Sequence, residues 1–360
     1  MDSLDDILAR AAERPGALNE EEREFLLSLE RPEEVAALHR AARMVKMREC
    51  GKGVALRALI ECGNICTKDC FYCGIRRSNR NIRRYAQSEE EIVAELHRAA
   101  ASGFGSAVLQ AGETESESNA NLFESVLRQV RHLDLGITLS LGEQSEETYR
   151  RWKAAGARRY LLRIETSDPE LYASLHPDSH RWQRRLECLE SLHRLGYQTG
   201  TGIMCGLPGQ SLRSVARDIG FFAKIDADMI GSGPYLPHPD TPLAGHDDGR
   251  SAEERLRLGL NLIAVTRLHL HDVNIASATA LQALREDGRE QGVAAGANVI
   301  MPNLTDESAR ANYRLYPGKP QLDCDTASMM ERLRHRLDAI GETIVNDASG
   351  DSKHFARRNR

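Results

Sequence analysis

The sequence predicts an α/β fold, a (β/α)8 TIM-type barrel with an N-terminal helical extension. Two observations support this fold class. Short apolar segments alternate with amphipathic segments along most of the chain, and eight of the apolar segments have the length of strands. Neighbouring parallel strands need a crossover that usually contains a helix, so eight strand-then-helix units fit a closed parallel barrel. A barrel of this kind can hold the 360 residues in one domain.

Residues 1–50 are predicted to form the helical extension. Three segments there, LDDILARAA, EEREFLLSLE and PEEVAALHRAARMVK, place apolar residues at helical spacing. Residues 51–345 are expected to form the barrel with a C-terminal helix, and residues 346–360 a charged tail. The last ten residues, DSKHFARRNR, are expected to fray, because a polar chain end with little to bury is poorly ordered.

The eight apolar segments are the predicted strands. In chain order they are VALRALIEC, SAVLQAG, GITLSLG, RYLLRIET, TGTGIMCG, DMIGSGPYL, VNIASATA and NVIMPN. Helical patterns lie between them. In residues 88–103 Ser88 is the expected N-cap, with Glu91 three residues later, and Gly103 ends the helix. The other predicted helices are SEETYRRWKAAG, RRLECLESLHRLG, SLRSVARDIGFFAKI and AEERLRLGLNLIAVTRLHL.

Composition argues against several classes of function. The net charge is -5, from 48 basic and 53 acidic residues, and no basic stripe suits a phosphate backbone, so nucleic acid is not an expected partner. No apolar run approaches the roughly 20 residues of a membrane span. The N-terminus is acidic and amphipathic, unlike a secretory signal. We therefore expect a cytoplasmic protein that does not bind a membrane.

Four of the eight cysteines lie within twelve residues, at Cys62, Cys66, Cys70 and Cys73. They follow the first predicted strand, and barrel enzymes place catalytic groups in the loops that follow strands. The last three have the spacing C-x3-C-x2-C. The cysteines of the whole chain are too unevenly spread for a disulfide framework, and clustered thiols more often serve metal or redox chemistry.

The number of thiolates favours an iron-sulfur cluster over zinc. Structural zinc needs four protein ligands. The only nearby candidate for a fourth is Cys62, whose side chain would point into the barrel if the strand alternates, and no histidine is close. Three thiolates at Cys66, Cys70 and Cys73 suit a [4Fe-4S] cluster whose fourth iron stays open. A non-catalytic protein that holds zinc remains the alternative from a different class.

The stretch C-x3-C-F-Y-C, in which Tyr72 precedes the third cysteine, resembles the signature of radical S-adenosylmethionine (SAM) enzymes. In that family the open iron binds the amino and carboxylate groups of SAM, and an electron from the cluster cleaves SAM to a 5'-deoxyadenosyl radical. A longer ordered set is similar to the HydE type, which helps to build the [FeFe]-hydrogenase H-cluster. Its motifs are NICTKDCFYCGIRRSNRNIRRY, VLQAGE, ITLSLGE, RYLLRIET, GIMCGLPGQ, PYLPHPDTPLA, GANVIMPN and YRLYPGK.

Polar residues at the ends of the second and third predicted strands are candidates for binding SAM. Gly112 and Glu113 end the second strand, where a backbone carbonyl and a carboxylate could bind the ammonium group, and Gln110 is a neighbour. Thr138 and Ser140 alternate with leucines, so both point to one side of the third strand.

Two further residues complete the expected SAM site. Glu165 ends an otherwise apolar strand, where a buried carboxylate needs a partner, and could hold the ribose hydroxyls. Arg185 on the following helix could form a paired hydrogen bond with the methionyl carboxylate. The resemblance places Ser140, Glu165 and Arg185 at SAM.

The resemblance also implies a substrate cavity beneath the radical. Its residues would be Arg163, Met229, Thr279, Met301, Tyr313 and Tyr316. Ordinary core packing is the alternative for the two methionines, because methionine fills gaps in any core. The implied substrate is a small cysteine-ligated iron carbonyl-cyanide species delivered by HydG, on which the radical would act at sulfur.

Partners and alternatives follow from the same resemblance. It implies transient contacts with HydG and HydF-type maturases, and an electron donor such as ferredoxin or flavodoxin. Two other radical SAM functions keep the fold and cofactors but change the substrate: an amino-acid mutase like methylornithine synthase, and sulfur insertion like that of biotin synthase. The segments PHPDTPLA and ANVIMPN favour the HydE type over both.

The chain departs from the HydE pattern in two places. Some HydE proteins bind an auxiliary cluster near the C-terminus with three cysteines, whereas here GKPQLDCDTASMMERL contains only Cys324. That cluster is therefore expected to be absent. In VNIASATAL, Ala278 precedes Thr279 where related proteins carry a threonine pair, so one polar group of the substrate site is expected to be altered.

Overall fold

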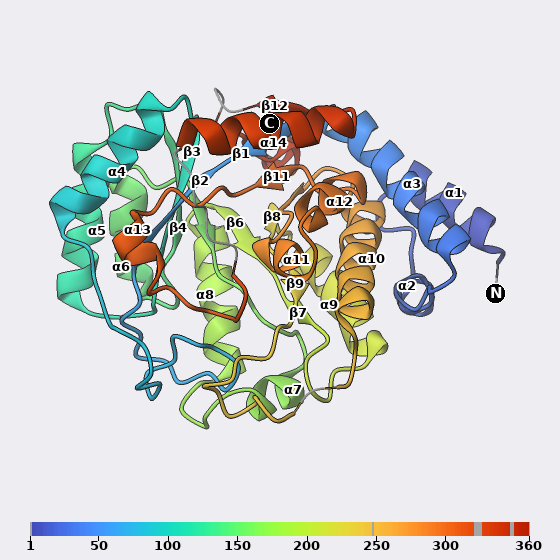
Figure 1. Ribbon diagram of the computed structural model, residues 1–360, viewed down its shortest axis with the longest axis horizontal. Coiled ribbons are helices and arrows are strands. Elements are labelled where there is room, and N and C mark those ends of the chain that lie inside the picture. Colours follow the sequence, from blue (N-terminus) through green and yellow to red (C-terminus); the bar gives the residue numbers. More distant parts are fainter. Residues whose placement is uncertain (1, 247, 320–325, 346–348, 360) are drawn as a thin grey trace.

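Parallel strands form a ring in the middle of the molecule, and helices surround it (Figure 1). The computed structural model describes residues 2–246, 248–319, 326–345 and 349–359. Seven strands form one parallel sheet in the order β10-β8-β6-β5-β4-β3-β2. They are β2 (Ala58–Gly63), β3 (Ser106–Ala111), β4 (Gly136–Ser140), β5 (Arg159–Leu161), β6 (Gln198–Thr201), β8 (Met229–Ile230) and β10 (Asn274–Ile275).

A second parallel sheet, in the order β11-β1-β12, closes the ring. β1 runs almost directly into β2, and β11 pairs with β1. Between β10 and β11, Ala276 forms an isolated bridge with Val299, and the amide of Ser277 donates to the carbonyl oxygen of Val299 at 2.9 Å. With β1 and β2 counted as one, eight parallel strands surround the barrel axis, which confirms the predicted fold. The added strands are β1 (Gly53–Leu56), β11 (Val299–Ile300) and β12 (Thr343–Val345).

Each of the eight predicted apolar segments contains a strand of the ring. Two segments continue past it and pair again as β7 (Met204–Cys205) and β9 (Gly233–Pro234). The predicted helices are also present. Ser88 caps α4 with the expected reciprocal bonds to Glu91. The barrel helices are α4 (Glu89–Ala101), α5 (Glu117–Gln129), α6 (Glu146–Ala155), α7 (Pro169–Ser174), α8 (Trp182–Arg194), α9 (Leu212–Lys224), α10 (Ala252–Leu270), α11 (Thr279–Leu284), α12 (Gly288–Ala294), α13 (Glu307–Arg310) and α14 (Thr326–Ala339).

Three N-terminal helices pack against one flank of the barrel, beside α9 and α10 (Figure 1). Their contacts include buried polar bonds. The guanidinium of Arg23 donates to the carbonyl oxygen of Ala216 at 2.9 Å. The side-chain amide of Asn261 donates to the carbonyl oxygen of Leu29 at 3.1 Å. These helices are therefore fixed to the barrel wall. They are α1 (Leu4–Glu13), α2 (Glu20–Leu27) and α3 (Pro32–Glu49).

The end of the chain forms a helix, which corrects the expectation that it frays. α15 (Lys353–Arg358) lies beneath the barrel, at the amino ends of the strands. Arg358 forms an ion pair of 3.0 Å with the buried Asp228, and the carbonyl oxygen of Gly350 accepts a hydrogen bond from Arg57 at 3.1 Å. The charged residues that suggest a solvated tail are instead paired with charges of the barrel floor. None of the described helices is both long enough and apolar enough to cross a membrane.

Candidate functional site

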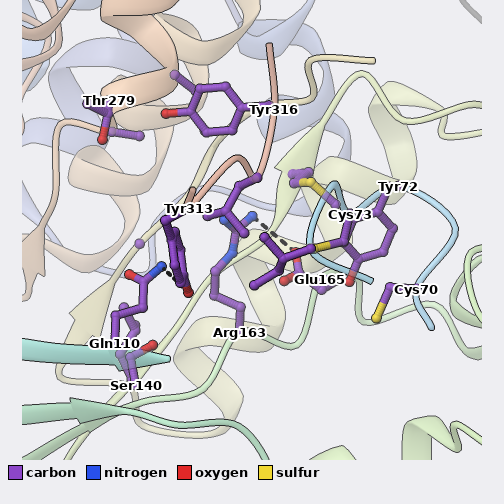
Figure 2. Close-up of a pocket in the computed structure, with 18 of the residues that line it drawn as sticks. Cys70, Tyr72, Cys73, Gln110, Ser140, Arg163, Glu165, Thr279, Tyr313 and Tyr316 are labelled. Atoms are coloured by element: carbon purple, nitrogen blue, oxygen red, sulfur yellow. Dashed lines mark hydrogen bonds and ion pairs between the residues drawn. The ribbon is translucent and has the colours of Figure 1, made fainter. Parts of the chain in front are cut away.

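A cavity of about 320 Å³ opens at the carboxyl ends of the barrel strands. All the residues predicted for the cluster, SAM and the substrate line it, except Thr138 and Met229. Figure 2 shows many of them pointing toward one another from different strands and loops. The predicted residues on the cavity wall are Cys66, Cys70, Tyr72, Cys73, Gln110, Gly112, Glu113, Ser140, Arg163, Glu165, Arg185, Thr279, Met301, Tyr313 and Tyr316.

The three thiols of the motif lie in the loop between β2 and α4 and are not joined in disulfides. Backbone hydrogen bonds fix this loop to other parts of the chain. The amide of Thr67 donates to the carbonyl oxygen of Glu113 at 2.8 Å. Further along, the amide of Gly74 donates to the carbonyl oxygen of Leu315 at 3.0 Å. The protein itself therefore holds the loop on the rim of the cavity.

Three thiols with no fourth ligand in the part of the chain that the structure describes suit an iron-sulfur cluster chemically. Among the described residues, no three Cys, His, Asp or Glu side chains are placed to hold one metal ion. A tetrahedral zinc site needs its ligands to converge on one point, whereas each thiolate of an iron-sulfur cluster binds a different iron. Burial raises the pKa of the Cys73 thiol to about 12. The thiolate form therefore needs metal cations beside it.

Gly112 allows the end of β3 to pass directly under the cysteine loop. A Cβ atom at this position would lie 2.3 Å from the carbonyl oxygen of Ile65 and 3.0 Å from the Cβ atom of Cys66. Both distances are below van der Waals contact, so any larger residue would push the loop away from the cavity. The absence of a side chain at Gly112 therefore lets the cysteine loop keep its place beside the cavity.

Arg163 and Glu165 form an ion pair in the middle of the cavity wall (Figure 2). Nη2 of Arg163 lies 3.0 Å from Oε2 of Glu165, but the two groups are not aligned for a hydrogen bond. These two atoms and Nε of Arg163 are buried without a hydrogen-bond partner. Buried polar atoms normally have partners, so the pair presents unused hydrogen-bonding capacity to the cavity.

Four alternating charges lie beside the cysteine loop. Nζ of Lys68 is 3.0 Å from Glu113 and 2.8 Å from Glu143. Arg185 bonds the same two carboxylates, at 3.3 Å and 2.7 Å, and its Nη1 donates to the carbonyl oxygen of Arg163 at 3.0 Å. Burial would lower the pKa of Lys68, but the two carboxylates outweigh burial and raise it. The guanidinium of Arg185 is therefore already engaged on every nitrogen by the protein.

Glu61 and Lys319 form a buried ion pair on another part of the cavity wall. Glu61 also accepts a hydrogen bond from the amide of Asn303 at 3.0 Å. Nζ of Lys319 donates to the carbonyl oxygen of Tyr313 and lies 4.9 Å from the centre of its ring. The sequence analysis missed this pair, although Glu61 is a lone carboxylate near the end of an apolar strand, which is the signal that identified Glu165.

Hydrogen bonds orient two aromatic side chains of the wall. The amide of Gln110 donates to the hydroxyl of Tyr313 at 3.1 Å, and Gln110 is paired in register with Ser140 on β4. The hydroxyl of Tyr72 lies 3.1 Å from Nε2 of His176. Since Nδ1 of His176 faces the carbonyl oxygen of Tyr172, Nε2 is the acceptor and the Tyr72 hydroxyl donates.

Thr279 and Tyr316 lie on the side of the cavity away from the cysteines (Figure 2), and Met301 and Ala278 also line the cavity. Burial raises the pKa of Tyr316 to about 12, so its hydroxyl is a neutral donor. Ala278 is the N-cap residue of α11 and offers no side-chain cap. The position that departs from the HydE pattern therefore does face the cavity.

Thr138 and Met229 lie deeper in the barrel than the other residues predicted for the site. They line a second cavity of about 20 Å³, one layer deeper in the barrel, whose wall includes Arg57. The sulfur of Met229 lies 3.0 Å from Nη1 of Arg57. Alternation correctly turns Thr138 and Ser140 to the same side, but two residues along a strand also separate one layer of the barrel from the next. The predicted absence of an auxiliary cluster concerns Cys324, which lies outside the described residues.

The sequence of the chain is similar to those of known proteins. Residues 60–222 match the model of the Radical SAM superfamily. The chain is 43% identical over 319 residues to the [FeFe] hydrogenase maturase subunit HydE of Thermotoga maritima, a match that covers 89% of this chain and 90% of that protein. It is 28% identical over 319 residues to 3-methylornithine synthase of Methanosarcina acetivorans, covering 88% of both.

Comparison with solved structures supports the same fold. The crystal structure of methylornithine synthase (PylB) matches with a TM-score of 0.82 and 26% identity, and the match covers 96% of this chain and 98% of that one. The whole barrel and its N-terminal helices are thus shared, and the similarity is not limited to the cysteine motif.

Proposed function

Because this chain belongs to the HydE family of radical SAM enzymes, we propose that it cleaves SAM reductively in the cytoplasm and acts in the maturation of an [FeFe]-hydrogenase. One observation carries the proposal. The three-cysteine loop lies on the rim of a barrel cavity whose wall presents Arg163 and Glu165 with unused hydrogen-bonding atoms. The name of the relative with 43% identity supports the hydrogenase pathway.

The cofactors of the family are a [4Fe-4S] cluster and SAM. Cys66, Cys70 and Cys73 would bind three of the irons. When both cofactors are bound, they supply an electron and a sulfonium bond whose cleavage gives methionine and a 5'-deoxyadenosyl radical. Gly112 keeps the space under the loop open, and the donated hydrogen bond to His176 orients Tyr72 beside it.

We assign the ribose of SAM to Glu165. Its buried Oε2 accepts no hydrogen bond from the protein, and a pair of hydroxyl groups is the kind of donor that would satisfy it. Ser140 and Gln110 lie on adjacent strand ends of the same wall and suit the remaining polar groups of SAM. All three side chains line the cavity, where their polar groups can reach a bound SAM molecule.

Arg185 keeps the role proposed for it at the methionyl carboxylate and gains a second one. Three of its five N–H groups donate to Glu113, Glu143 and the carbonyl oxygen of Arg163, which leaves one N–H on each terminal nitrogen for the carboxylate of SAM. We propose that it positions Glu113 and the Arg163 backbone, and that Glu113 and Gly112 take the ammonium group of SAM. Substituting lysine would lose the planar fork and loosen both contacts.

The substrate end is assigned to Arg163, Thr279, Met301, Tyr313 and Tyr316. A cationic guanidinium and neutral hydroxyls suit a small anionic substrate, and we propose a cysteine-ligated iron carbonyl-cyanide species made by a HydG-type maturase. Tyr313 is 1% exposed, so its side chain closes that part of the cavity wall to water. Exclusion of water protects a radical from side reactions.

A second candidate is an amino-acid mutase of the 3-methylornithine synthase type. The specific observation in its favour is the Glu61–Lys319 pair, because opposite charges on a cavity wall can recognise the head group of an amino acid. The lower identity of 28% to that enzyme, against 43% to HydE, ranks it second.

In vitro maturation separates the two candidates. Apo-hydrogenase is incubated with HydF- and HydG-type maturases, SAM and reductant, with or without this protein. We expect hydrogenase activity only when this protein is present, and none with its Cys66→Ala variant. Formation of 3-methylornithine from lysine, with no effect on hydrogenase activity, would favour the mutase and overturn the proposal.

A further inference from the structure

A strongly basic stretch follows the cysteine motif. Residues 76–84, RRSNRNIRR, contain five arginines and no acidic residue, in a chain whose net charge is -5. The stretch runs along the surface between the cysteine loop and α4, at the lower left in Figure 1. So dense a local charge costs repulsive energy, so each arginine needs a structural or functional reason.

Two of the five arginines have a structural role. The guanidinium of Arg84 donates to backbone carbonyl oxygens of the loop, including those of Asn64 at 2.7 Å and Ile75 at 2.8 Å. Arg76 forms an ion pair of 3.0 Å with Asp69. Both side chains therefore hold the cysteine loop in shape and point inward.

The other three arginines, Arg77, Arg80 and Arg83, are exposed. None of them forms an ion pair or a side-chain hydrogen bond within the part of the chain that the structure describes. The nearby Arg77 helps to lower the pKa of Asp69 through its charge, but forms no direct bond with it. All three are therefore available to a partner of opposite charge.

Two of these arginines are bonded to the cysteine loop through their backbone groups. The amide of Arg77 donates to the carbonyl oxygen of Lys68 at 2.8 Å, within the motif itself. The carbonyl oxygen of Arg83 accepts from the side-chain amide of Asn64 at 2.8 Å, two residues before Cys66. Backbone bonds thus tie the cationic segment to both ends of the stretch that carries the thiols.

An exposed apolar residue lies next to the same thiols. Ile65 directly precedes Cys66 and is 50% exposed. Among the described residues only one other large hydrophobic side chain, Met44 on α3, is classed as exposed. A small apolar spot with a rim of charge is typical of a protein interface.

We propose that Ile65, Arg77, Arg80 and Arg83 form the docking surface for an acidic redox protein of the flavodoxin class. The inference rests on the proposed function, which needs a donor of single electrons. For each SAM that is cleaved, one electron leaves the donor and the sulfonium carbon–sulfur bond breaks. Charge complementarity selects an acidic donor, and the bonds that join this segment to the cysteine loop bring the donor next to the thiols.

The test compares two triple variants with the same change in net charge. One is Arg77→Glu/Arg80→Glu/Arg83→Glu. The control is Arg40→Glu/Arg131→Glu/Arg158→Glu, three exposed arginines for which the described residues provide no ion-pair partner. Arg40 is on α3, and the other two precede β4 and β5 at the opposite end of the barrel. Neither set includes a residue assigned to a cofactor or substrate.

Two measurements are made on each protein. The first is the Kd of an oxidised acidic flavodoxin, followed by flavin fluorescence, which does not depend on SAM cleavage. The second is the rate of SAM cleavage with reduced flavodoxin and, separately, with dithionite. We expect the first triple variant to weaken flavodoxin binding and the flavodoxin-driven rate by about tenfold or more at low salt, with no change in the dithionite-driven rate. Raising the salt concentration should reduce the difference in flavodoxin affinity between the wild type and the first triple variant.

Equal flavodoxin affinity in the two triple variants would overturn the proposal. If the first triple variant lost SAM cleavage with both flavodoxin and dithionite, flavodoxin binding would be measured again with Arg80→Glu alone. A loss of flavodoxin binding would then support docking, and unchanged binding would refute it. Absence of SAM cleavage with either reductant would count against the proposed function, while the binding measurement would still decide the docking surface.

Discussion

Arg163 and Glu165 face each other at 3.0 Å inside the barrel, and the backbone of Glu165 adopts a left-handed φ of 67°. This conformation is unusual for a residue with a side chain and costs on the order of 1 to 3 kcal/mol. The amide of Glu165 is held by the carbonyl oxygen of Gly202 at 3.1 Å. The neighbouring Ser167 is held by Asp218 through its backbone amide and its hydroxyl. The fold thus maintains the strain, which suggests a functional reason for the position of the carboxylate.

The first prediction concerns that carboxylate. Glu165→Gln should weaken SAM binding by about 1 to 3 kcal/mol, because a hydrogen bond to a buried charge is replaced by a neutral contact. Isothermal titration of the reconstituted protein with SAM measures the change. The exposed Glu170→Gln serves as the control, since Glu170 lies one turn beyond the site at the start of α7. Equal affinities for SAM in Glu165→Gln and wild type would remove Glu165 from the site.

The second prediction concerns the iron content. Alanine in place of Cys66, Cys70 or Cys73 should abolish the cluster, because two thiolates do not hold it in place of three. Iron and sulfide analysis after anaerobic reconstitution gives the result. Cys50→Ala, outside the cavity, should retain wild-type iron, and Cys324→Ala should as well. Near-wild-type iron in any of the three motif variants would contradict the assignment.

Local patterns were sufficient to predict the barrel. All eight strand segments were identifiable, because strands that are buried on both faces form short apolar runs. α5 was missed, although Ala120, Phe123, Val126 and Leu127 form its buried face. The end of the chain was misjudged for a different reason. Its charges pair with Asp226, Asp228 and Asp272, which are distant in sequence, and no local pattern reveals such partners.

The sequence predicted many of the residues that form the site. It did not predict how deep each one lies along the barrel axis or which residues form ion pairs with one another. A motif supplied the thiols, and strand ends supplied most of the polar wall. Depth along the barrel axis depends on how strands are staggered, so the sequence did not show that Thr138 and Met229 line a second, deeper cavity. The ion pairs of Arg185 with Glu113 and Glu143 were not predicted, because the two carboxylates come from two different strand ends that only the folded barrel brings together.

The third prediction concerns the altered far end of the cavity. Ala278→Thr should tighten the binding of small anions or thiol-containing amino acids by about three- to tenfold, since one neutral hydrogen bond contributes roughly 0.5 to 1.5 kcal/mol. The hydroxyl would face the cavity and could also cap α11. SAM cleavage without substrate should not change. Anion titrations of Ala278→Thr and Thr279→Ala provide the test. Wild-type anion affinity in both variants would show that this strand end does not contact the substrate.

The fourth prediction concerns the docked C-terminus. Hydrogen bonds from His354 to Asp272 (3.1 Å) and Asp226 (2.7 Å) raise the pKa of His354 to about 9. A folded pKa above the unfolded value of about 6.5 means that the stabilisation is complete below pH 6.5 and is lost as the pH rises through 9. His354→Gln should therefore lower the thermal midpoint at pH 6.5 but not at pH 9.5.

Thermal unfolding at the two pH values checks this prediction. His335→Gln, an exposed histidine on α14, is the matched control and should follow the wild type at both. The same difference between wild type and His354→Gln at pH 6.5 and pH 9.5 would show that His354 does not hold α15 through its charge.

Product analysis of SAM is the most direct test of the central claim. Reconstituted protein with close to four irons per chain is reduced with dithionite under argon and incubated with SAM, and the products are separated by chromatography. We expect 5'-deoxyadenosine and methionine in equal amounts, and neither product from the Cys66→Ala variant. A fully loaded, reduced protein that binds SAM and yields no 5'-deoxyadenosine, with or without the iron carbonyl-cyanide substrate, would contradict the radical SAM function.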